Sequence, residues 1–510
     1  MTRRWIALAL GVLLAGSAGA APGDKLDVVR DLAGRVGPII GAALACRDIA
    51  RPRIQVIVDK FAVVIKEASA ADAERADVTQ LLDRAVADGR RSVTTGQIDC
   101  ASADRQLADL EKSIAGPISP GLAAPTTAAP TTSTASTAVR GISDREIRFG
   151  ISAPFSGSAK ELGRQMKLGI DAAFNRVNDA GGVEGRMLRL IAADDGYEPT
   201  RTAETMKQLY EKDRVFGIIG NVGTPTAVVA VPYALERKML FFGAFTGANL
   251  LRRDPPDRYV FNYRASYAEE TDAVVRYLVK VRRITPKQIA VFAQQDPYGD
   301  SGFAGVARAM RALGAGDGTV LRLNYQRNTV DVDDAIAQLK AHKTPIKAIV
   351  MVSTYRAAAR FIEKTRDLYP AMIYTNVSFV GSTALADELM LLGKRYATGV
   401  IVTQVVPAVA GYSSVVLEYK SALAKYFPGE APDYVSLEGY VAANVLVQAL
   451  KRSGPQLDTE KLVDTLESMR NLDMGLGTSL NFGRGEHQAS HKVWGTALDE
   501  TGKYQAIELD

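Results

Sequence analysis

The sequence predicts an α/β protein of two lobes, each built on a doubly wound parallel sheet, preceded by a small helical domain. Three observations lead to this fold class. Apolar side chains recur with a helical period up to about residue 115, and an uncharged stretch rich in Pro, Thr and Ala follows. Short β-branched runs then alternate with amphipathic helices to the end of the chain. At 510 residues the chain is also long enough for two or three folded units.

The first twenty residues have the pattern of a secretory signal peptide. Arg3 and Arg4 precede an apolar run from Trp5 to Leu14, and Ala18-Gly19-Ala20 supplies small residues for cleavage. The run is shorter than the roughly 20 residues that a membrane-spanning helix needs, and no lipid-accepting cysteine follows it. We therefore expect a mature chain that begins near Ala21, lies in the periplasm and has no membrane span after signal removal.

Composition is typical of a globular protein and argues against a nucleic-acid partner. Hydrophobic residues make up 47% and charged residues 23% of the chain, which is the usual globular balance. The formal charge of +5 falls to +3 without the two signal arginines, since 60 basic side chains then face 57 acidic ones. So small a charge does not predict a nucleic-acid-binding surface. We expect a monomer that binds a small-molecule solute.

Residues 21–115 are predicted to form a small helical domain, with its later helices at about Ala71–Ser92 and Ala103–Ile114. Cys46 and Cys100 are the only cysteines in the chain. Export would place them in an oxidising compartment, so we expect a disulfide between them. Two free thiols or a half-built metal site are the alternatives, and a metal site would require nearby histidines, which this region lacks.

Residues 116–140 are predicted to form a linker. Its central part, from Ala124 to Thr132, has neither a charged nor a large apolar side chain. It cannot bury a hydrophobic face and should be extended and semi-stiff. The second folded domain therefore begins near residue 141.

Beyond residue 141, short β-branched runs alternate with amphipathic helices. Strands that alternate with helices of ten or more residues form parallel sheets with right-handed crossovers. There are more such units than one sheet comfortably holds, so we predict two lobes. The predicted strands are Ile147–Ser152, Met187–Ala192, Val215–Gly220, Met239–Phe242, Gln288–Phe292, Val320–Tyr325, Ala348–Val352 and Gly399–Gln404, and the first helices are Lys160–Ala180, Pro199–Lys212 and Thr226–Arg237.

Ligands bind beyond the carboxyl ends of the strands in such sheets, so the loops there are the candidate site. The first loop carries Phe155 and Ser156 ahead of a helix, whose first amides favour an anionic group, although a capping turn that binds nothing is the equal alternative. The loops Gly220–Thr226 and Gly243–Ala248 repeat glycines and hydroxyls. Neither loop matches a phosphate-binding or dinucleotide motif, so we expect no nucleotide cofactor.

Two tyrosines follow predicted strands in the second half of the chain. Tyr298 lies in Asp296-Pro297-Tyr298-Gly299, and Tyr355 ends Ser353-Thr354-Tyr355. A tyrosine offers a flat apolar face and a hydroxyl, which suits closure over a small molecule. Plain packing at the start of a helix is the alternative for each of them.

The chain lacks the residue patterns of common hydrolases. It contains neither G-x-S-x-G nor H-E-x-x-H. His487 and His491 are spaced like one helical turn, but the Gly- and Ser-containing tail around them need not be helical. The neighbours Asp194 and Asp195 are expected to cap the next helix instead of acting as a catalytic pair. We therefore expect no catalytic residue, no metal and no cofactor.

Residues 141–510 resemble the type I periplasmic binding proteins, in particular the branched-chain amino-acid-binding branch that serves ABC importers. The order and spacing of several segments make the resemblance specific, whereas no single motif would suffice. These segments are Ile147–Gly157, Ala180–Gly185, Asp194–Gly196, Val215–Thr226, Phe242–Ala248, Tyr259–Glu269 and Asp296–Gly299.

The resemblance implies two lobes that close by a hinge movement over the solute. It places one lobe at about 141–263 and 407–484 and the other at about 264–405 and 485–510. The three crossing segments would lie near Tyr263–Ala265, Thr403–Val406 and Phe482–Gly485.

The resemblance also implies a set of binding residues. In that family a cradle of backbone and hydroxyl groups on the first lobe holds the α-carboxylate and ammonium of the ligand, and the matching positions are Thr224, Ala244 and Thr246. The second lobe contributes tyrosines, which match Tyr298 and Tyr355.

Thr383 departs from the family pattern, because amino-acid binders carry a carboxylate there for the ammonium of the ligand. A buried ammonium without a counter-ion would be costly. An aromatic or aliphatic acid, an amide or a modified amino compound therefore fits at least as well as a standard α-amino acid. Phe155, Tyr197 and Phe245 would favour a ring-bearing solute if they face the cleft.

The leading functional prediction is a non-enzymatic solute-binding component that delivers its ligand to an inner-membrane ABC permease. A sensing or regulatory module that acts on a receptor or a cell-wall enzyme is the alternative, and the additional helical domain favours it. A hydrolase on a similar fold is a third reading, for which the chain shows no nucleophile, base or metal ligand set.

Overall fold

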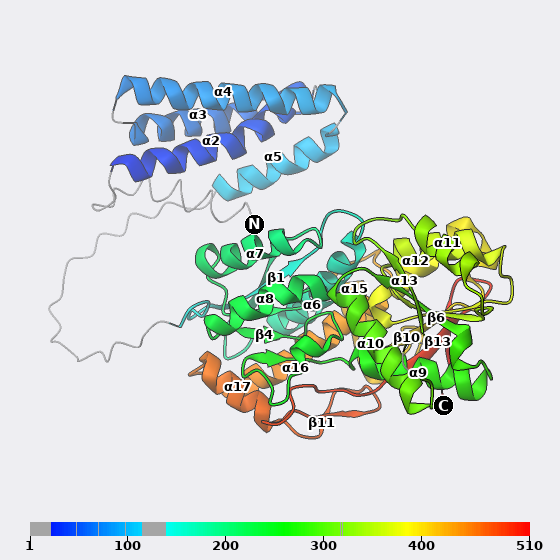
Figure 1. The fold of residues 1–510 in the computed structure, drawn as a ribbon. Helices are drawn as coiled ribbons and strands as arrows, with labels where there is room; N and C mark the ends of the chain where they lie inside the picture. The colour runs from blue at the N-terminus through cyan, green and yellow to red at the C-terminus, as the bar shows by residue number, and fades with distance from the viewer. Residues whose placement is uncertain are drawn as a thin grey trace. The chain divides into compact units, whose positions relative to one another are not determined.

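The computed structural model describes residues 22–114 and 139–509, apart from residues 47, 70, 97, 317 and 319. The chain divides into two compact units after Ser133 (Figure 1). The predicted signal peptide and all but the last two residues of the predicted linker lie outside the described residues. None of the described helices has a long enough apolar stretch to cross a bilayer.

The N-terminal unit contains the helices α2 (Pro22–Ala45), α3 (Arg51–Ala68), α4 (Asp72–Thr94) and α5 (Cys100–Ile114) (Figure 1). Helix α5 begins three residues earlier than the sequence predicts, because Asp99 caps it by accepting a hydrogen bond of 2.6 Å from the Ser102 backbone. The Cys46–Cys100 disulfide joins the end of α2 to the start of α5, which confirms the predicted pairing. The apolar side chains of these helices pack together in one core. This core includes Val29, Leu32, Val36, Ile40, Ile54, Ile57, Phe61 and Leu107.

The first lobe of the second unit is built on a parallel five-stranded sheet with the order β2-β1-β3-β4-β5. β1 pairs in register with β2 along its whole length, and Phe149 in its centre is fully buried because both faces of the sheet are covered. The strands are β1 (Glu146–Ala153), β2 (Met187–Asp194), β3 (Gly217–Ile219), β4 (Leu240–Phe242) and β5 (Val260–Phe261), and the helices are α6 (Lys160–Asp179), α7 (Pro199–Lys207), α8 (Thr224–Glu236), α15 (Ser414–Tyr426), α16 (Tyr434–Ser453) and α17 (Thr459–Ser468).

The second lobe is built on a seven-stranded sheet with the order β14-β13-β10-β9-β8-β6-β7. Its strand pairs are parallel except at one edge, where β13 is antiparallel to both of its neighbours, β10 and β14. The strands are β6 (Ile289–Gln294), β7 (Leu321–Tyr325), β8 (Ala348–Val352), β9 (Ile373–Asn376), β10 (Ile401–Gln404), β13 (Trp494–Leu498) and β14 (Tyr504–Ile507), and the helices are α9 (Tyr267–Arg276), α10 (Pro297–Ala312), α11 (Asp333–Ala341), α12 (Tyr355–Arg366), α13 (Ser382–Leu392) and α14 (Lys394–Ala397).

The chain passes between the two sheets three times, which leaves the lobes joined side by side (Figure 1). The passages lie between β5 and α9, between β10 and α15, and between β12 (Ser479–Leu480) and β13. β12 pairs with β11 (Leu472–Asp473) in a small ribbon beyond α17. This architecture confirms the predicted fold class of two α/β lobes preceded by helices.

Candidate functional site

The first loop of lobe 1 is held by Asp194, the last residue of β2. Its Oδ1 accepts hydrogen bonds from the backbone of Phe155 at 2.8 Å and of Ser156 at 3.2 Å, and its Oδ2 accepts one from the Ser156 hydroxyl at 2.6 Å. Burial alone would raise the pKa of Asp194, but these bonds and those from Gly196 and Arg201 lower it to about 2. Phe155 and Ser156, both predicted as site residues, are thus fixed at the carboxyl edge of the sheet.

Asp195 lies deeper and fixes the same loop from below. Its carboxylate accepts hydrogen bonds from the Ser152 hydroxyl at 2.8 Å, the Tyr197 backbone at 2.9 Å and the Thr202 hydroxyl at 3.2 Å. Burial raises the pKa of Asp195 to about 6. Glu198 occupies the capping position of α7, so the expected capping role of the two aspartates is wrong. Both carboxylates instead turn toward the sheet edge and hold the loops there.

Two threonine hydroxyls meet at the carboxyl ends of β3 and β4. The Oγ1 atoms of Thr224 and Thr246 are 2.7 Å apart, and both residues are fully buried. Ala244 is buried beside them and its carbonyl accepts a hydrogen bond from the Thr246 backbone at 2.9 Å. In such a pair one hydroxyl hydrogen lies between the oxygens and the other remains available to a ligand. The structure therefore brings these three predicted residues together.

Aromatic side chains from both lobes form a layer beside the hydroxyl pair. Phe245 of lobe 1 stacks on Phe379 of lobe 2 with ring centroids 5.0 Å apart. The Tyr298 ring lies 4.6 Å from Phe379 and 5.3 Å from Tyr267, and the Tyr197 ring lies 6.1 Å from Phe379. The layer joins three predicted residues (Phe245, Tyr298 and Tyr197) to two residues that the sequence did not single out. Its flat faces suit an apolar or ring-bearing group.

The Tyr267 hydroxyl links this layer to the threonines. It lies next to Thr224 and Thr246, without a hydrogen bond of standard geometry to either or to any other described residue. Burial raises the pKa of Tyr267 to about 12, so the hydroxyl keeps its proton at neutral pH. A protonated, buried hydroxyl without a partner is a donor that a bound solute can satisfy.

A buried arginine, Arg264, lies at the first passage between the lobes. It donates to Glu270 at 3.0 Å, makes a close contact with Ser378 and lies 3.5 Å from Glu438. Its Nε has no hydrogen-bond partner among the described residues, and its guanidinium carbon lies 5.0 Å from the Phe245 ring centroid. The guanidinium of Arg252 also lies near the two carboxylates. Burial raises the pKa of Glu438 to about 7, with Arg264 and Arg252 opposing the shift.

Polar contacts across the cleft hold the two lobes in a closed arrangement. Gln294 at the end of β6 donates to the Tyr197 hydroxyl at 3.1 Å. Arg327 pairs with Glu198 at 2.8 Å, and Asn328 donates to the other oxygen of that carboxylate at 2.5 Å. Each contact joins a lobe 2 residue to the loop after β2, so opening the cleft would break all of them.

Tyr355 and Thr383 line a separate cavity of about 180 Å³ where α12 and α13 of lobe 2 face α6 and the start of α16. Tyr355 is buried next to the backbone of Glu161. Thr383 lies next to Asp433, the capping residue of α16. The structure therefore places these two predicted residues at a second contact between the lobes, apart from the aromatic layer.

Sequence reasoning missed the charged and aromatic residues at the centre of the cleft. Arg264, Tyr267 and Glu270 lie within or just after the segment Tyr259–Glu269, which resembles the family as a whole without showing a role for any one side chain. Phe379 lies two residues before Gly381, in a loop from which the sequence predicts only Thr383 as a site residue. A buried arginine has no distinctive signal in a single sequence, because surface arginines are far more common.

The two histidines fix the third passage between the lobes. His487 Nδ1 lies 2.9 Å from the Val260 carbonyl, and its ring stacks on Phe261 with centroids 3.8 Å apart. His491 Nδ1 lies 2.6 Å from Glu269 on α9. The described residues contain no group of three or more side chains that could hold a metal ion. The histidines therefore join the passage to lobe 1 and lobe 2 respectively.

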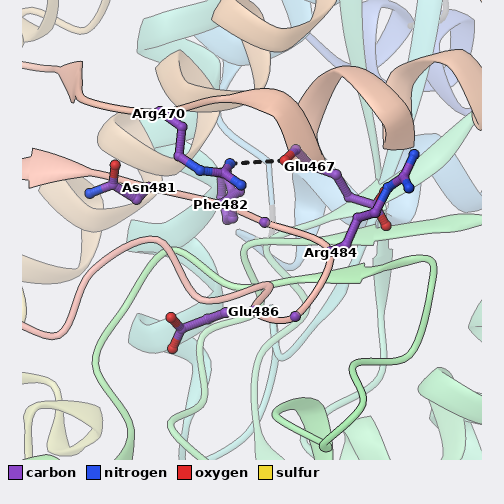
Figure 2. Close-up of a pocket in the computed structure, with 8 residues that line it drawn as sticks. Glu467, Arg470, Asn481, Phe482, Arg484 and Glu486 are labelled. Atoms are coloured by element: carbon purple, nitrogen blue, oxygen red, sulfur yellow. Dashed lines mark hydrogen bonds and ion pairs between the residues drawn. The ribbon is translucent and has the colours of Figure 1, made fainter.

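An open hollow of about 580 Å³ lies outside the cleft, between the end of α17 and the third passage (Figure 2). Arg470 donates to the Glu467 carbonyl at 2.9 Å, and Arg484 and Glu486 line the rim. The hollow has side chains of both charges and no contribution from lobe 2 strands. It is therefore a surface feature and not part of the candidate solute site.

Comparisons with known proteins agree with this architecture. Residues 146–503 match a family described as periplasmic binding protein. A Leu/Ile/Val-binding protein homolog 3 from Brucella melitensis biotype 1 is 25% identical over 339 residues, which cover 65% of this chain and 86% of that protein. An amino acid binding protein from Pseudomonas aeruginosa is 22% identical over 327 residues, covering 63% and 83% of the two chains.

Solved structures of periplasmic and solute-binding proteins also superpose on most of this chain. A possible leucine/isoleucine/valine-binding protein from Rhodopirellula baltica SH 1 superposes with a TM-score of 0.68 and 39% identity, over 73% of this chain and 98% of that one. A substrate-binding periplasmic protein from Ralstonia solanacearum reaches 0.65 and 26%, over 71% and 100%. The helical unit at residues 22–114 lies outside the segment that matches the family.

Proposed function

We propose that this chain, which belongs to the periplasmic binding protein family, captures a small organic solute between its lobes and delivers it to an ABC permease. Its relatives are substrate-binding proteins and not enzymes. One observation carries the proposal. Polar groups with unused hydrogen-bonding capacity, the Thr224–Thr246 hydroxyl pair and the Tyr267 hydroxyl, are buried beside an aromatic layer to which both lobes contribute.

The chemistry of these groups supports a solute with one polar end and one apolar or ring-bearing part. Hydroxyl donors and the unpartnered Nε of Arg264 suit a carboxylate or an amide oxygen. The ring faces of Phe245 and Phe379 suit the remainder of the solute. Aromatic or aliphatic acids, amides and amino-acid-like compounds share this pattern, and the names of the relatives point to amino acids.

Hinge closure is the mechanism that the contacts across the cleft support. In the closed arrangement, Arg327 and Asn328 of lobe 2 bind Glu198 of lobe 1, and Phe379 covers Phe245. A solute that touches both lobes binds the closed form better than the open one and shifts the population toward it. A permease can then distinguish the loaded protein from the empty one by its shape.

We also propose that the chain is exported to the periplasm. The signal-like segment at residues 1–20 and the Cys46–Cys100 disulfide both favour an oxidising compartment outside the cytoplasm. A solute captured there would pass to a permease in the inner membrane.

A thermal-shift screen tests solute capture. The mature protein, unfolded and refolded to remove bound ligand, is screened against aromatic acids, aliphatic acids, amides and amino acids. A ligand at 100 times its Kd stabilises the folded state by about 2.7 kcal/mol. The Thr246→Val variant, which keeps the side-chain shape but removes the hydroxyl, should weaken binding of that ligand by about tenfold or more.

Thr365→Val is the matched control, because Thr365 is equally buried but bonds to Phe361 and Tyr374 within lobe 2. It should leave the affinity unchanged. If no compound in the screen stabilises the well-folded protein, or if Thr246→Val binds as tightly as the parent, solute capture at this cleft is contradicted.

A sensing module is the second candidate, and the helical unit outside the matched family segment is the observation that favours it. Uptake of the radiolabelled solute by cells with and without the gene separates the two functions. Import predicts that uptake is lost with the gene. A sensor predicts unchanged uptake and a solute-dependent change in another process.

A further inference from the structure

A set of polar contacts joins the lobes at the edge of the cleft that lies farthest from the passages between them. In lobe 1 the edge strand is β2, four strand spacings of about 4.8 Å from β5, which leads into the first passage. In lobe 2 the edge strand is β7, whereas β10 and β13, which carry the other two passages, lie toward the opposite edge. A rotation about the passages therefore moves the loops after β2 and β7 apart by the largest distance.

Asn328, three residues after β7, uses its whole side-chain amide for contacts with lobe 1. Its Nδ2 donates to the Gly196 carbonyl at 3.1 Å and to Glu198 at 2.5 Å, and its Oδ1 accepts a hydrogen bond from the Ser158 hydroxyl at 3.1 Å. An amide nitrogen carries two hydrogens, so both are used across the cleft. Arg327 adds an ion pair of 2.8 Å with Glu198. Opening of the lobes would break all four contacts.

The lobe 2 half of these contacts is held in shape within its own lobe. Asn328 has a φ of +61°, which asparagine tolerates better than most residues, and a hydrogen bond of 3.2 Å from the Thr329 backbone to the Gln326 carbonyl closes the turn around it. Arg327 lies 3.3 Å from Asp296, the capping residue of α10. Contacts inside lobe 2 therefore orient both side chains.

The lobe 1 half is held in the same way. The Glu198 backbone donates to the Asp195 carbonyl at 2.9 Å, and Asp195 Oδ1 accepts a hydrogen bond from the Tyr197 backbone at 2.9 Å. The Gly196 backbone donates to Asp194 at 3.0 Å. Because each half is formed within its own lobe, bringing the two halves together orders few side chains and costs little conformational entropy.

These contacts lie apart from the threonine pair proposed to bind the solute. They follow the edge strands β2 and β7, whereas Thr224 and Thr246 follow β3 and β4, which lie closer to the first passage. The contacts therefore depend on closure of the lobes and not on the chemistry of the solute.

We propose that Glu198, Arg327 and Asn328 form a latch that closes without solute, so that a fraction of the empty protein is closed, and that the latch slows the release of a captured solute. The first effect is independent of solute capture, whereas the second rests on the proposed function. A contact made only in the closed state favours that state whether or not a ligand is bound. Residues outside the binding site then slow release by the same factor for every solute held in the closed form.

Single-molecule fluorescence energy transfer on the full mature protein tests the latch without any solute. Dyes on Lys160→Cys in lobe 1 and Lys394→Cys in lobe 2 should report a closed and an open population. Asn328→Asp keeps a residue that tolerates the left-handed conformation, but it removes both donors and places a second carboxylate beside Glu198. It should lower the ratio of closed to open molecules about tenfold or more. The double variant Asn328→Asp/Glu198→Gln, in which amide and carboxylate have changed places, should recover part of this loss.

Asn324→Asp is the matched control, because Asn324 lies in β7 itself and accepts a hydrogen bond of 2.8 Å from Arg322 of the same strand. It should leave the closed fraction of the empty protein unchanged. An empty parent protein that is entirely open, or equal closed fractions in Asn328→Asp and the parent, would overturn the latch. An equally large loss in Asn324→Asp would overturn it too.

Stopped-flow release of a solute from the thermal screen tests the second effect. Asn328→Asp should raise the dissociation rate about tenfold without slowing association, and two solutes of different chemistry should show the same factor. An unchanged dissociation rate would overturn the role of the latch in release. If no solute binds, the proposed function fails, while energy transfer in the empty protein still decides whether the latch exists.

Discussion

At Glu438, burial outweighs the neighbouring guanidiniums of Arg264 and Arg252. Arg264 bonds directly to Glu270 at 3.0 Å and approaches Glu438 only to 3.5 Å. The pKa of Glu438 is consequently raised from 4.5 to about 7, first by burial and also by Glu270. Between pH 4.5 and 7, the folded protein therefore holds a proton on Glu438 that the unfolded chain has already released.

The stability that this proton contributes has a defined pH window. It is fully present below pH 4.5 and is lost as the pH rises through 7, a change on the order of 3 kcal/mol. Glu438→Gln is uncharged at every pH, so its Tm should fall less between pH 5 and 8 than that of the parent. Glu236→Gln, at an exposed position, should follow the parent. Parallel Tm curves for Glu438→Gln and the parent would contradict the buried protonated carboxyl.

Single residues also show where sequence reasoning ends. Thr224 and Thr246 could be singled out because hydroxyls beside glycines follow predicted strands at the edge where ligands bind. Arg264 and Phe379 could not, because their partners Glu438 and Phe245 lie far away in the sequence. Thr383 is predicted as a ligand-binding residue, yet it lies next to Asp433 and lines a separate cavity.

At the scale of elements, the close packing of α2 on α4 depends on glycine. A Cβ at Gly41 would lie 2.0 Å from the Val86 carbonyl oxygen, whereas a Cβ at Gly34 in the same helix would have nothing within 4 Å. Gly34→Ala should raise the stability of the helical unit by up to about 1 kcal/mol through helix propensity. Gly41→Ala should lower it by about 1 to 3 kcal/mol through overpacking. Denaturant titration of the two variants measures the change in the free energy of unfolding, which should rise for one and fall for the other. Equal effects would contradict the close contact of α2 with α4 at Gly41.

The Cys46–Cys100 disulfide closes a loop across the helical unit, with a sequence separation of 54. Chain entropy sets its contribution at about 4 kcal/mol as an upper value. In calorimetry, the Cys46→Ser/Cys100→Ser variant should therefore show a lower Tm for the unfolding of the helical unit alone. The transition of the second unit should stay in place, because the two units are separately compact. A shift of both transitions would show that the units unfold together.

Most elements could be predicted from periodicity and a few could not. The runs that became β1, β2, β6, β7 and β8 are β-branched and lie between helices, and their predicted bounds are close to the observed ones. The sequence did not predict β5, β9, β11, β12, β13 or β14. Most of these strands are short, and Ile373–Asn376 and Tyr504–Ile507 also mix polar with apolar residues. The helix predicted at Pro199–Lys212 is α-helical as far as Lys207. A π-helical turn then continues it to Lys212.

At the scale of the whole chain, function depends on the relation between the lobes. The centre of the cleft is built from long-range partners, as in Phe245 with Phe379 and Tyr197 with Gln294. The two-lobed fold could be predicted because its repeating strands and helices are local patterns. The contacts across the cleft could not, since they depend on how far the lobes close.

Solute-driven closure is most directly measured by fluorescence energy transfer between the lobes. Dyes are placed on Lys160→Cys at the start of α6 and Lys394→Cys in α14, both exposed, with the native disulfide left oxidised. Addition of the solute from the thermal screen should shift the transfer efficiency along a saturable curve whose midpoint equals the Kd of that solute, and Thr246→Val should move the midpoint to higher concentration. Binding of the solute without any change in transfer efficiency would contradict capture by lobe closure.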